Sequence, residues 1–232
     1  MRLFATAALG LALLAGCQAP GVREYWTGVP LLEDNIKVSE DRFAQFTELA
    51  VSSPEEDALA ALDLLFDRMK EDGVAYYIYA EWMEAAFYNP LSPCRNVTLF
   101  THAVNRIAAD GILNDDECRP FIQKRDWMQL NQKGHPALVP DVVLEGASTL
   151  VLVLDASCPS CREALTKLGE DKKWEDFRKV AVLCGYGPEP EIPGWEYIRP
   201  KAAEAVFDIH FTPVYFTVNS DGIVTESYKL AI

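Results

Sequence analysis

Two cysteines separated by two residues, Cys158 and Cys161, are the residues whose types and spacing most directly suggest chemistry. The reactive form of a cysteine is the thiolate, which attacks disulfides and forms a mixed disulfide. A helix that begins at such a pair stabilises the first thiolate through its partial positive charge and its free N–H groups. We therefore expect Cys158 to be the nucleophile and Cys161 to be the resolving thiol.

The residues around the pair predict a strand before it and a helix after it. An unbroken apolar run with β-branched residues fills positions 150–154 and is too short for a typical helix. Such a run is typical of a strand buried on both faces of a parallel or mixed sheet. After the pair, Leu165 and Leu168 lie on one side of a helical segment that Gly169 is expected to end.

The same pair has two structural interpretations, a disulfide without redox function and half of a zinc site. A structural zinc needs four ligands, usually two such pairs or a cysteine pair with a histidine pair. The sequence has no second Cys-x-x-Cys, and its three histidines are isolated from one another. We favour redox chemistry and expect neither a metal nor a cofactor.

A second segment, residues 211–224, contains Thr212 and Pro213, a predicted strand, an Asn-Ser-Asp-Gly turn and another predicted strand. Together the two segments resemble the thioredoxin superfamily, whose members combine a strand–Cys-x-x-Cys–helix unit with a later cis-proline loop and hairpin. The resemblance implies thiol–disulfide exchange. It also implies that Pro213 is the cis-proline and that Thr212 presents its backbone to the substrate.

Several positions depart from the superfamily's pattern. Ser157 stands where thioredoxins usually have an aromatic residue, and Leu152 stands where they usually have a buried acid that relays protons. The sequence stops at Ile232, shortly after the last predicted strand, where the superfamily usually adds a helix. Asp155 stands where peroxiredoxins place a threonine, which weakens a peroxidase alternative.

The first residues predict export. Arg2 and the apolar residues 3–14 form the n-region and h-region of a signal peptide over residues 1–16, and the h-region is too short to span a bilayer. The Leu-Ala-Gly-Cys run ending at Cys17 resembles a bacterial lipobox, which implies lipid on Cys17 and a stable membrane anchor. The alternative is an ordinary signal peptide with a chance cysteine. We expect a periplasm-facing, lipid-anchored protein of the cell envelope, at the outer membrane, where disulfides persist.

Residues 31–133, after a tether at 17–30, have helical periodicity and predict an all-helical domain of about five short helices. Aromatic residues gather over 74–88 at helical spacing, which favours a bundle core over a ligand site. Residues 134–147 are expected to be a linker with a lead-in strand at 141–145. The predicted fold class is α+β overall, an all-helical N-terminal domain followed by a thioredoxin-like α/β domain, residues 148–232, with a central mixed sheet.

The whole mature chain resembles a group of Bacteroidota lipoproteins that carry an uncharacterised helical domain before a thioredoxin-like (TlpA-type) domain. The resemblance rests on Tyr25-Trp26, on the run Asn-Pro-Leu-Ser-Pro-Cys-Arg-Asn at 89–96, and on the Cys-x-x-Cys and Thr-Pro elements. It implies exchange with protein thiols or disulfides of the envelope and favours a reductase, with isomerase and oxidase left open. The alternative is a redox-inert binding lipoprotein whose helical domain grips a peptide or glycan.

The remaining cysteines are expected to be structural. Cys94 and Cys118 should lie at opposite ends of a helical hairpin, too far apart for a disulfide. Cys184 should end a strand beside the one before Cys158, as a buried, inert thiol in preference to a third reactive one. We expect the helical domain to cover the sheet face that a terminal helix would occupy, with a dimer interface as the alternative.

Composition limits the partners. The formal net charge of −14 argues against binding nucleic acid, because little of the surface would neutralise phosphates. The chain of 232 residues, half of them hydrophobic, is long enough for one large or two small domains with a real core. These features do not predict an oligomeric state.

Overall fold

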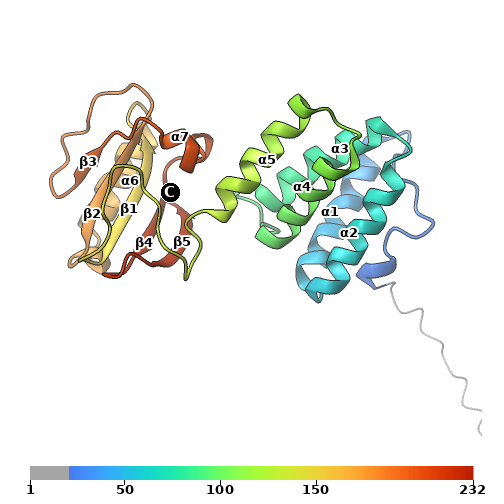
Figure 1. Cartoon of the computed structure of the whole chain (residues 1–232), viewed down its shortest axis with the longest axis horizontal. Helices are drawn as coiled ribbons and strands as arrows, with labels where there is room; N and C mark the ends of the chain where they lie inside the picture. The colour runs from blue at the N-terminus through green and yellow to red at the C-terminus, as the bar shows by residue number, and fades with distance from the viewer. Residues whose placement is uncertain (1–20, 232) are drawn as a thin grey trace, which may run out of the picture.

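The computed structural model describes residues 21–231. The predicted signal peptide at 1–16, the predicted lipidation site Cys17 and the first part of the predicted tether lie outside the described residues. The described chain forms an all-helical domain followed by a domain built on a mixed sheet, joined end to end in an elongated molecule (Figure 1). This architecture confirms the predicted fold class.

The helical domain contains five α-helices, and its helix starts follow from local sequence. Four of the five begin at an Asn or Asp whose side chain accepts hydrogen bonds from the first turn. At Asn114 the cap is reciprocal, since the Glu117 side chain accepts from the Asn114 N–H. The helices are α1 (Ile36–Ser52), α2 (Glu55–Met69), α3 (Gly73–Met83), which continues as the π-helical turn η2 (Glu84–Tyr88), α4 (Val97–Asp110) and α5 (Asp115–Gln129).

Aromatic side chains form much of the core of this domain. Trp26 is fully buried, with its ring centroid 5.2 Å from Phe46 and 5.6 Å from Tyr79. Tyr79 belongs to the predicted aromatic cluster, most of which is buried as expected, although Tyr77 is exposed. Elsewhere in the domain, Cys94 and Cys118 are both buried free thiols, which confirms that they do not pair.

The second domain has a five-stranded sheet in the order β3-β2-β1-β4-β5. The three strands β3, β2 and β1 are parallel, whereas β4 is antiparallel to both β1 and β5. The central strand β1 is buried almost throughout, as its apolar run predicts. The strands are β1 (Thr149–Asp155), β2 (Arg178–Cys184), β3 (Glu196–Ile198), β4 (Val214–Val218) and β5 (Val224–Leu230).

Each face of the sheet buries alternate residues of β1. Leu150, Leu152 and Leu154 pack on the helix α6 (Pro159–Glu170) and on Trp174, whereas Val151 and Val153 face the opposite side. That opposite face is covered by the short helix α7 (Ala203–Val206) and by apolar residues of the segment between the domains. Both apolar faces therefore have cover from within the chain.

The predicted lead-in strand at 141–145 is wrong. Asp141 adopts a left-handed backbone conformation, with φ of 64°, which interrupts an extended strand. The segment makes one isolated bridge to the β4–β5 turn, from Glu145 to Asp221, and a second bridge, from Pro136 to Ile223, lies earlier in the linker. It contributes side chains to the core as a loop and adds no strand to the sheet.

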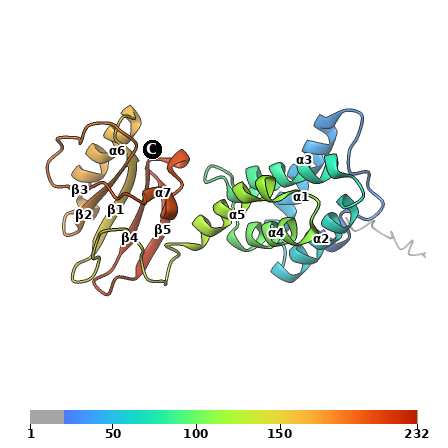
Figure 2. The same cartoon turned by 45° about the horizontal axis from the view of Figure 1, so that its top comes forward.

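The helical domain does not cover the sheet face beside α6, and that expectation is also wrong. Over β4 and β5 this face carries polar pairs, since the hydroxyls of Thr217 and Thr225 lie 2.7 Å apart and Lys173 pairs with Glu226. Such a surface needs no apolar cover. Instead, α5 lies nearest the sheet domain, and the contacts between domains involve α7 and the residues that follow it (Figure 2).

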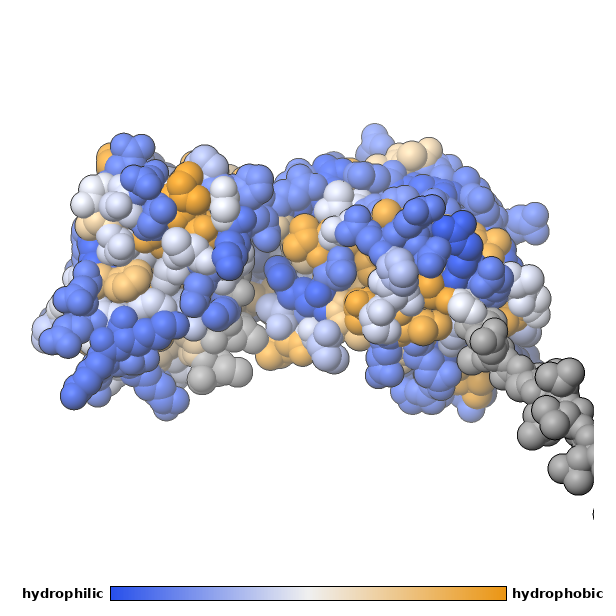
Figure 3. All heavy atoms as spheres, turned by 90° about the horizontal axis from the view of Figure 1, so that it is seen from below, coloured by the Kyte–Doolittle hydropathy of each residue, from blue (hydrophilic) through white to orange (hydrophobic). Residues whose placement is uncertain are grey.

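The surface is largely hydrophilic in the view of Figure 3, where two lobes are joined by a narrower waist and hydrophobic residues form only scattered patches. Among residues 21–231, the helices all fall short of the length and apolarity needed to cross a bilayer.

Candidate active site

The cysteine pair lies at the point where β1 turns into α6. β1 ends at Asp155, and Cys158 is the N-cap residue of α6 in an extended conformation. Pro159 occupies the first helical position, where its fixed φ suits the helix and its missing N–H costs nothing. The free N–H groups of the helix therefore point toward Cys158, as the sequence predicts.

The two thiols have opposite environments. The half-buried Cys158 sulfur lies 2.9 Å from the Ser160 hydroxyl. Hydrogen bonds from this hydroxyl, and then from the Cys161 N–H, lower the pKa of Cys158 below its ordinary value. Cys161 is fully buried, and its burial raises the pKa of its thiol to about 12. The pair is thus a reachable thiol that ionises readily beside a shielded thiol that stays protonated.

The Thr212–Pro213 peptide bond is cis. It follows the short 3-10 helix η4 (Ile209–Phe211) and leads directly into β4, which lies beside β1. The Thr212 hydroxyl donates to the Ile209 carbonyl at 3.3 Å, and the proximity of this side chain to Cys161 acts to lower the pKa of that thiol, against the larger effect of burial. The fold therefore brings Thr212 to Cys161, although 50 residues of sequence separate them.

Asp155 and Leu152 belong to β1, the strand that leads to the cysteine pair. The Asp155 carboxylate accepts from the Ser157 hydroxyl at 2.7 Å and from the Ser157 N–H at 2.8 Å, and these bonds lower its pKa. Asp155 thus orders the turn before Cys158 as an anion. Leu152, at the position where thioredoxins usually have a buried acid, is fully buried in an apolar cluster and cannot carry a proton.

A loop that the sequence reasoning missed lies against this turn. It follows β2, and at Gly187 an added Cβ would sit 2.5 Å from the Ser157 nitrogen. The Arg199 guanidinium donates to the carbonyls of Gly185 and Gly187, while the Tyr186 side chain is fully exposed. The signal in the sequence was the Gly-Tyr-Gly run at 185–187, directly after the strand that Cys184 is predicted to end, and this strand ends at the same sheet edge as the cysteine pair.

Cys184 ends β2 opposite Asp155 in the parallel register, as expected. It is buried, and this burial raises the pKa of its thiol to about 11. The prediction of a buried cysteine is confirmed. Within residues 21–231, the His, Cys, Asp and Glu side chains form no cluster of three that could hold a metal ion.

Comparison with solved structures gives a match over the whole chain. A crystal structure of a thioredoxin-like protein from Bacteroides caccae aligns with a TM-score of 0.69, covering 100% of this chain and 96% of that chain. The fold is thioredoxin-like. The two sequences are 16% identical, so the likeness establishes the fold and leaves the chemistry to the site. No family model matches the sequence, and no curated protein matches it.

Proposed function

We propose that this protein is a thiol–disulfide oxidoreductase that reduces protein disulfides through Cys158 and Cys161. The main support for this proposal is the asymmetry of the pair, in which an accessible thiol of lowered pKa lies beside a buried thiol of raised pKa. Exchange needs this division of roles, because one sulfur must meet the substrate and the other must wait to resolve the intermediate.

In the first step the Cys158 thiolate attacks one sulfur of a substrate disulfide. The substrate S–S bond breaks, a mixed disulfide forms, and the displaced substrate thiolate takes a proton. In the second step Cys161 loses its proton and attacks the Cys158 sulfur, which breaks the mixed disulfide and releases the second substrate thiol. Two electrons pass from the protein dithiol to the substrate, and an external dithiol must then reduce the Cys158–Cys161 disulfide.

The loop at Thr212–Pro213 supports a polypeptide substrate. It precedes β4 and lies at Cys161, so an extended substrate segment placed there would bring its disulfide to the adjacent Cys158. Main-chain hydrogen bonds to such a loop would hold substrates of different sequence, in the manner of an added β-strand.

The environment of Cys158 favours a reductase over a strong oxidant. The main causes of its lowered pKa are hydrogen bonds from a neutral hydroxyl and from backbone N–H groups. A strong oxidant has a high reduction potential because its reduced form stabilises the thiolate far more strongly than such hydrogen bonds do. The intervening residues Pro159 and Ser160 match neither the Gly-Pro of thioredoxin nor the Pro-His of the strong periplasmic oxidants.

We also propose that the protein is anchored in the cell envelope by lipid on Cys17 and faces the periplasm at the outer membrane. The support is the Leu-Ala-Gly-Cys run that follows an apolar segment with an N-terminal positive charge. Metabolic labelling with a fatty acid should mark the wild type and should not mark Cys17→Ser. Equal labelling of both proteins would contradict the anchor.

Reduction of insulin in the presence of dithiothreitol tests the exchange activity. We expect the wild type to accelerate the reaction and Cys158→Ser to be inactive. Cys161→Ser should instead accumulate mixed disulfides with protein substrates, because it attacks but cannot resolve. If wild type and Cys158→Ser give the same rate with insulin and with extracted envelope proteins, the redox-inert binding lipoprotein becomes the better interpretation.

A further inference from the structure

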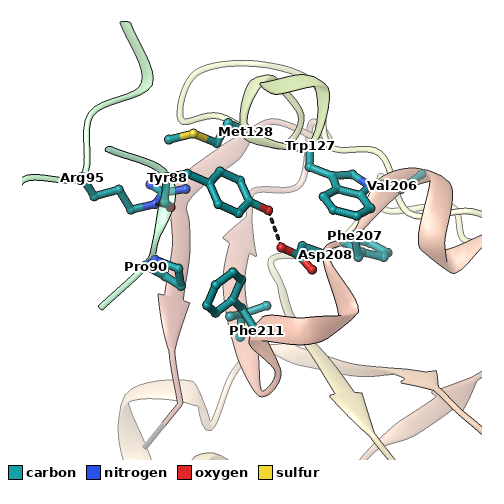
Figure 4. Close-up of a pocket in the computed structure, with 10 residues that line it drawn as sticks. Tyr88, Pro90, Arg95, Trp127, Met128, Val206, Phe207, Asp208 and Phe211 are labelled. Carbon is teal, nitrogen blue, oxygen red and sulfur yellow. Dashed lines mark hydrogen bonds between the residues drawn. The ribbon is translucent and has the colours of Figure 1, made fainter. Parts of the chain in front are cut away.

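The helical domain touches the sheet domain around a small apolar pocket, and the segment it touches leads to the candidate active site. Figure 4 shows aromatic side chains from both domains around this pocket, with the Tyr88 hydroxyl directed at the Asp208 carboxylate. Trp127 of α5 adds a second polar contact, because its indole N–H donates to the Glu204 carbonyl at 2.9 Å.

Tyr88 is held firmly on the helical side. It ends η2, it is 4% exposed, and its ring centroid lies 5.2 Å from that of Phe100. Burial, followed by the hydrogen bond to Asp208, raises the pKa of Tyr88 far above its ordinary value. The hydroxyl is therefore protonated and donates to the Asp208 carboxylate.

Asp208 links Tyr88 to the turn that precedes the loop. Its second carboxylate oxygen accepts from the His210 N–H at 2.9 Å and caps η4. The last residue of η4, Phe211, packs edge-on against Tyr88 with ring centroids 5.8 Å apart. The next residue is Thr212, whose hydroxyl donates back to the Ile209 carbonyl and which lies close enough to Cys161 to influence the pKa of its thiol. Val214, directly after Pro213, pairs with Val153 of β1, the strand that leads to the cysteine pair.

We propose that Tyr88 is a positioning residue: through Asp208 and Phe211 the helical domain fixes the η4 turn and thereby the Thr212–Pro213 loop at the cysteine pair. The structural part of this inference stands on the contacts alone, and the effect on exchange rests on the proposed function. It assigns to the helical domain the role of holding the loop that receives the substrate.

The chain offers a matched control. Tyr88→Phe removes one buried hydroxyl that bonds across the domain junction. Tyr76→Phe removes another, since the fully buried Tyr76 donates to Asp110 at 3.1 Å entirely within the helical domain. Both variants lose a buried hydrogen bond to a carboxylate, so a general loss of stability should affect them alike. Only Tyr88→Phe should disturb the loop.

Two readouts test the proposal in the full chain. Hydrogen exchange of the amides at 209–212 should quicken by about fivefold or more in Tyr88→Phe and remain at the wild-type rate in Tyr76→Phe. The rate of insulin reduction should fall about fivefold to tenfold in Tyr88→Phe alone. The pH profile for alkylation of Cys158 should not move in either variant, because that thiol is stabilised by α6.

Asp208→Asn closes a double-mutant cycle. The effects of Tyr88→Phe and Asp208→Asn on loop exchange should be strongly non-additive, because the amide has one acceptor oxygen where the carboxylate uses one for the His210 N–H and the other for the Tyr88 hydroxyl, so both variants weaken the same contact. Equal effects of Tyr88→Phe and Tyr76→Phe, or additive effects of the two junction variants, would overturn the proposal. If Tyr88→Phe slows insulin reduction without quickening amide exchange at 209–212, Tyr88 does not act through the η4 turn and the proposal is overturned. If wild type and Cys158→Ser reduce insulin equally, the proposed function fails, while amide exchange still decides whether Tyr88 positions the loop.

Discussion

Replacing Ser160 by Ala isolates one cause of the reactivity of Cys158. The Ser160 hydroxyl, 2.9 Å from the Cys158 sulfur, is the largest cause of the lowered pKa of that thiol. Ser160 is exposed at the start of α6, where Ala is well tolerated, so the variant should fold normally. We expect the pKa of Cys158 to rise in Ser160→Ala.

The size of the effect follows from the site. A hydrogen bond to a charged group contributes about 1.5–3 kcal/mol, and at this exposed position water replaces part of it, leaving about 1 kcal/mol. That energy corresponds to about fivefold in the thiolate equilibrium. A more basic thiolate is also more nucleophilic, with a Brønsted coefficient of about 0.4–0.5, which offsets nearly half of the loss on a logarithmic scale. Alkylation of Cys158 should therefore be about twofold to threefold slower in Ser160→Ala than in the wild type at pH values below the Cys158 pKa of both proteins. At pH values above both pKa values it should be about twofold faster in Ser160→Ala.

The assay is the rate of iodoacetamide alkylation of Cys158 across a pH series, in a background where Cys161 is replaced by Ser in every protein. Thr166→Ala is the control, since its hydroxyl donates to the Arg162 carbonyl on the preceding turn of α6 and lies outside the site. The two pH profiles of wild type and Ser160→Ala should cross. Superimposable profiles, or a uniform slowing at every pH, would refute the assigned role of the hydroxyl.

Two further predictions concern stability. Gly187→Ala should destabilise the fold by about 1–3 kcal/mol in thermal unfolding, because the added Cβ would lie 2.5 Å from the Ser157 nitrogen. Gly73→Ala is the control and should be neutral, because an added Cβ there would meet nothing within 4 Å. Equal melting temperatures of the two variants would contradict the close approach at Gly187. The buried Cys184 thiol has its pKa raised from 9.0 to about 11, so its contribution to folding is present below about pH 9 and is lost as pH rises toward 11. Urea unfolding should show a decline with pH that is shallower in Cys184→Ala by up to about 1.4 kcal/mol per pH unit, and parallel declines would contradict it.

Features of the fold that depend on local sequence were predictable. The strand before Cys158, the helix after it and the hairpin after Pro213 follow from short patterns of apolar residues, turn residues and prolines. The asymmetry of the two thiols also follows, because a helix start exposes its first cysteine and turns the second inward.

Features that depend on packing between distant segments were not predictable. Tyr88 has the sequence signature of a core aromatic residue, and its hydroxyl partner Asp208 lies 120 residues away. The approach of Gly187 to the turn before Cys158 depends on the register of β1 and β2. Hydrophobic periodicity predicts the two strands but does not fix their register. The segment at 141–145 has the composition of a strand, but the left-handed Asp141 makes it a loop.

A redox titration of Cys158 and Cys161 against a dithiothreitol buffer tests the central claim most directly. We predict that the pair forms one reversible two-electron couple with a potential near that of thioredoxin, about −270 mV, as a reductase requires. A pair that forms no intramolecular disulfide in the folded protein would contradict the exchange mechanism. A potential near the roughly −120 mV of the strong periplasmic oxidants would contradict the assigned direction.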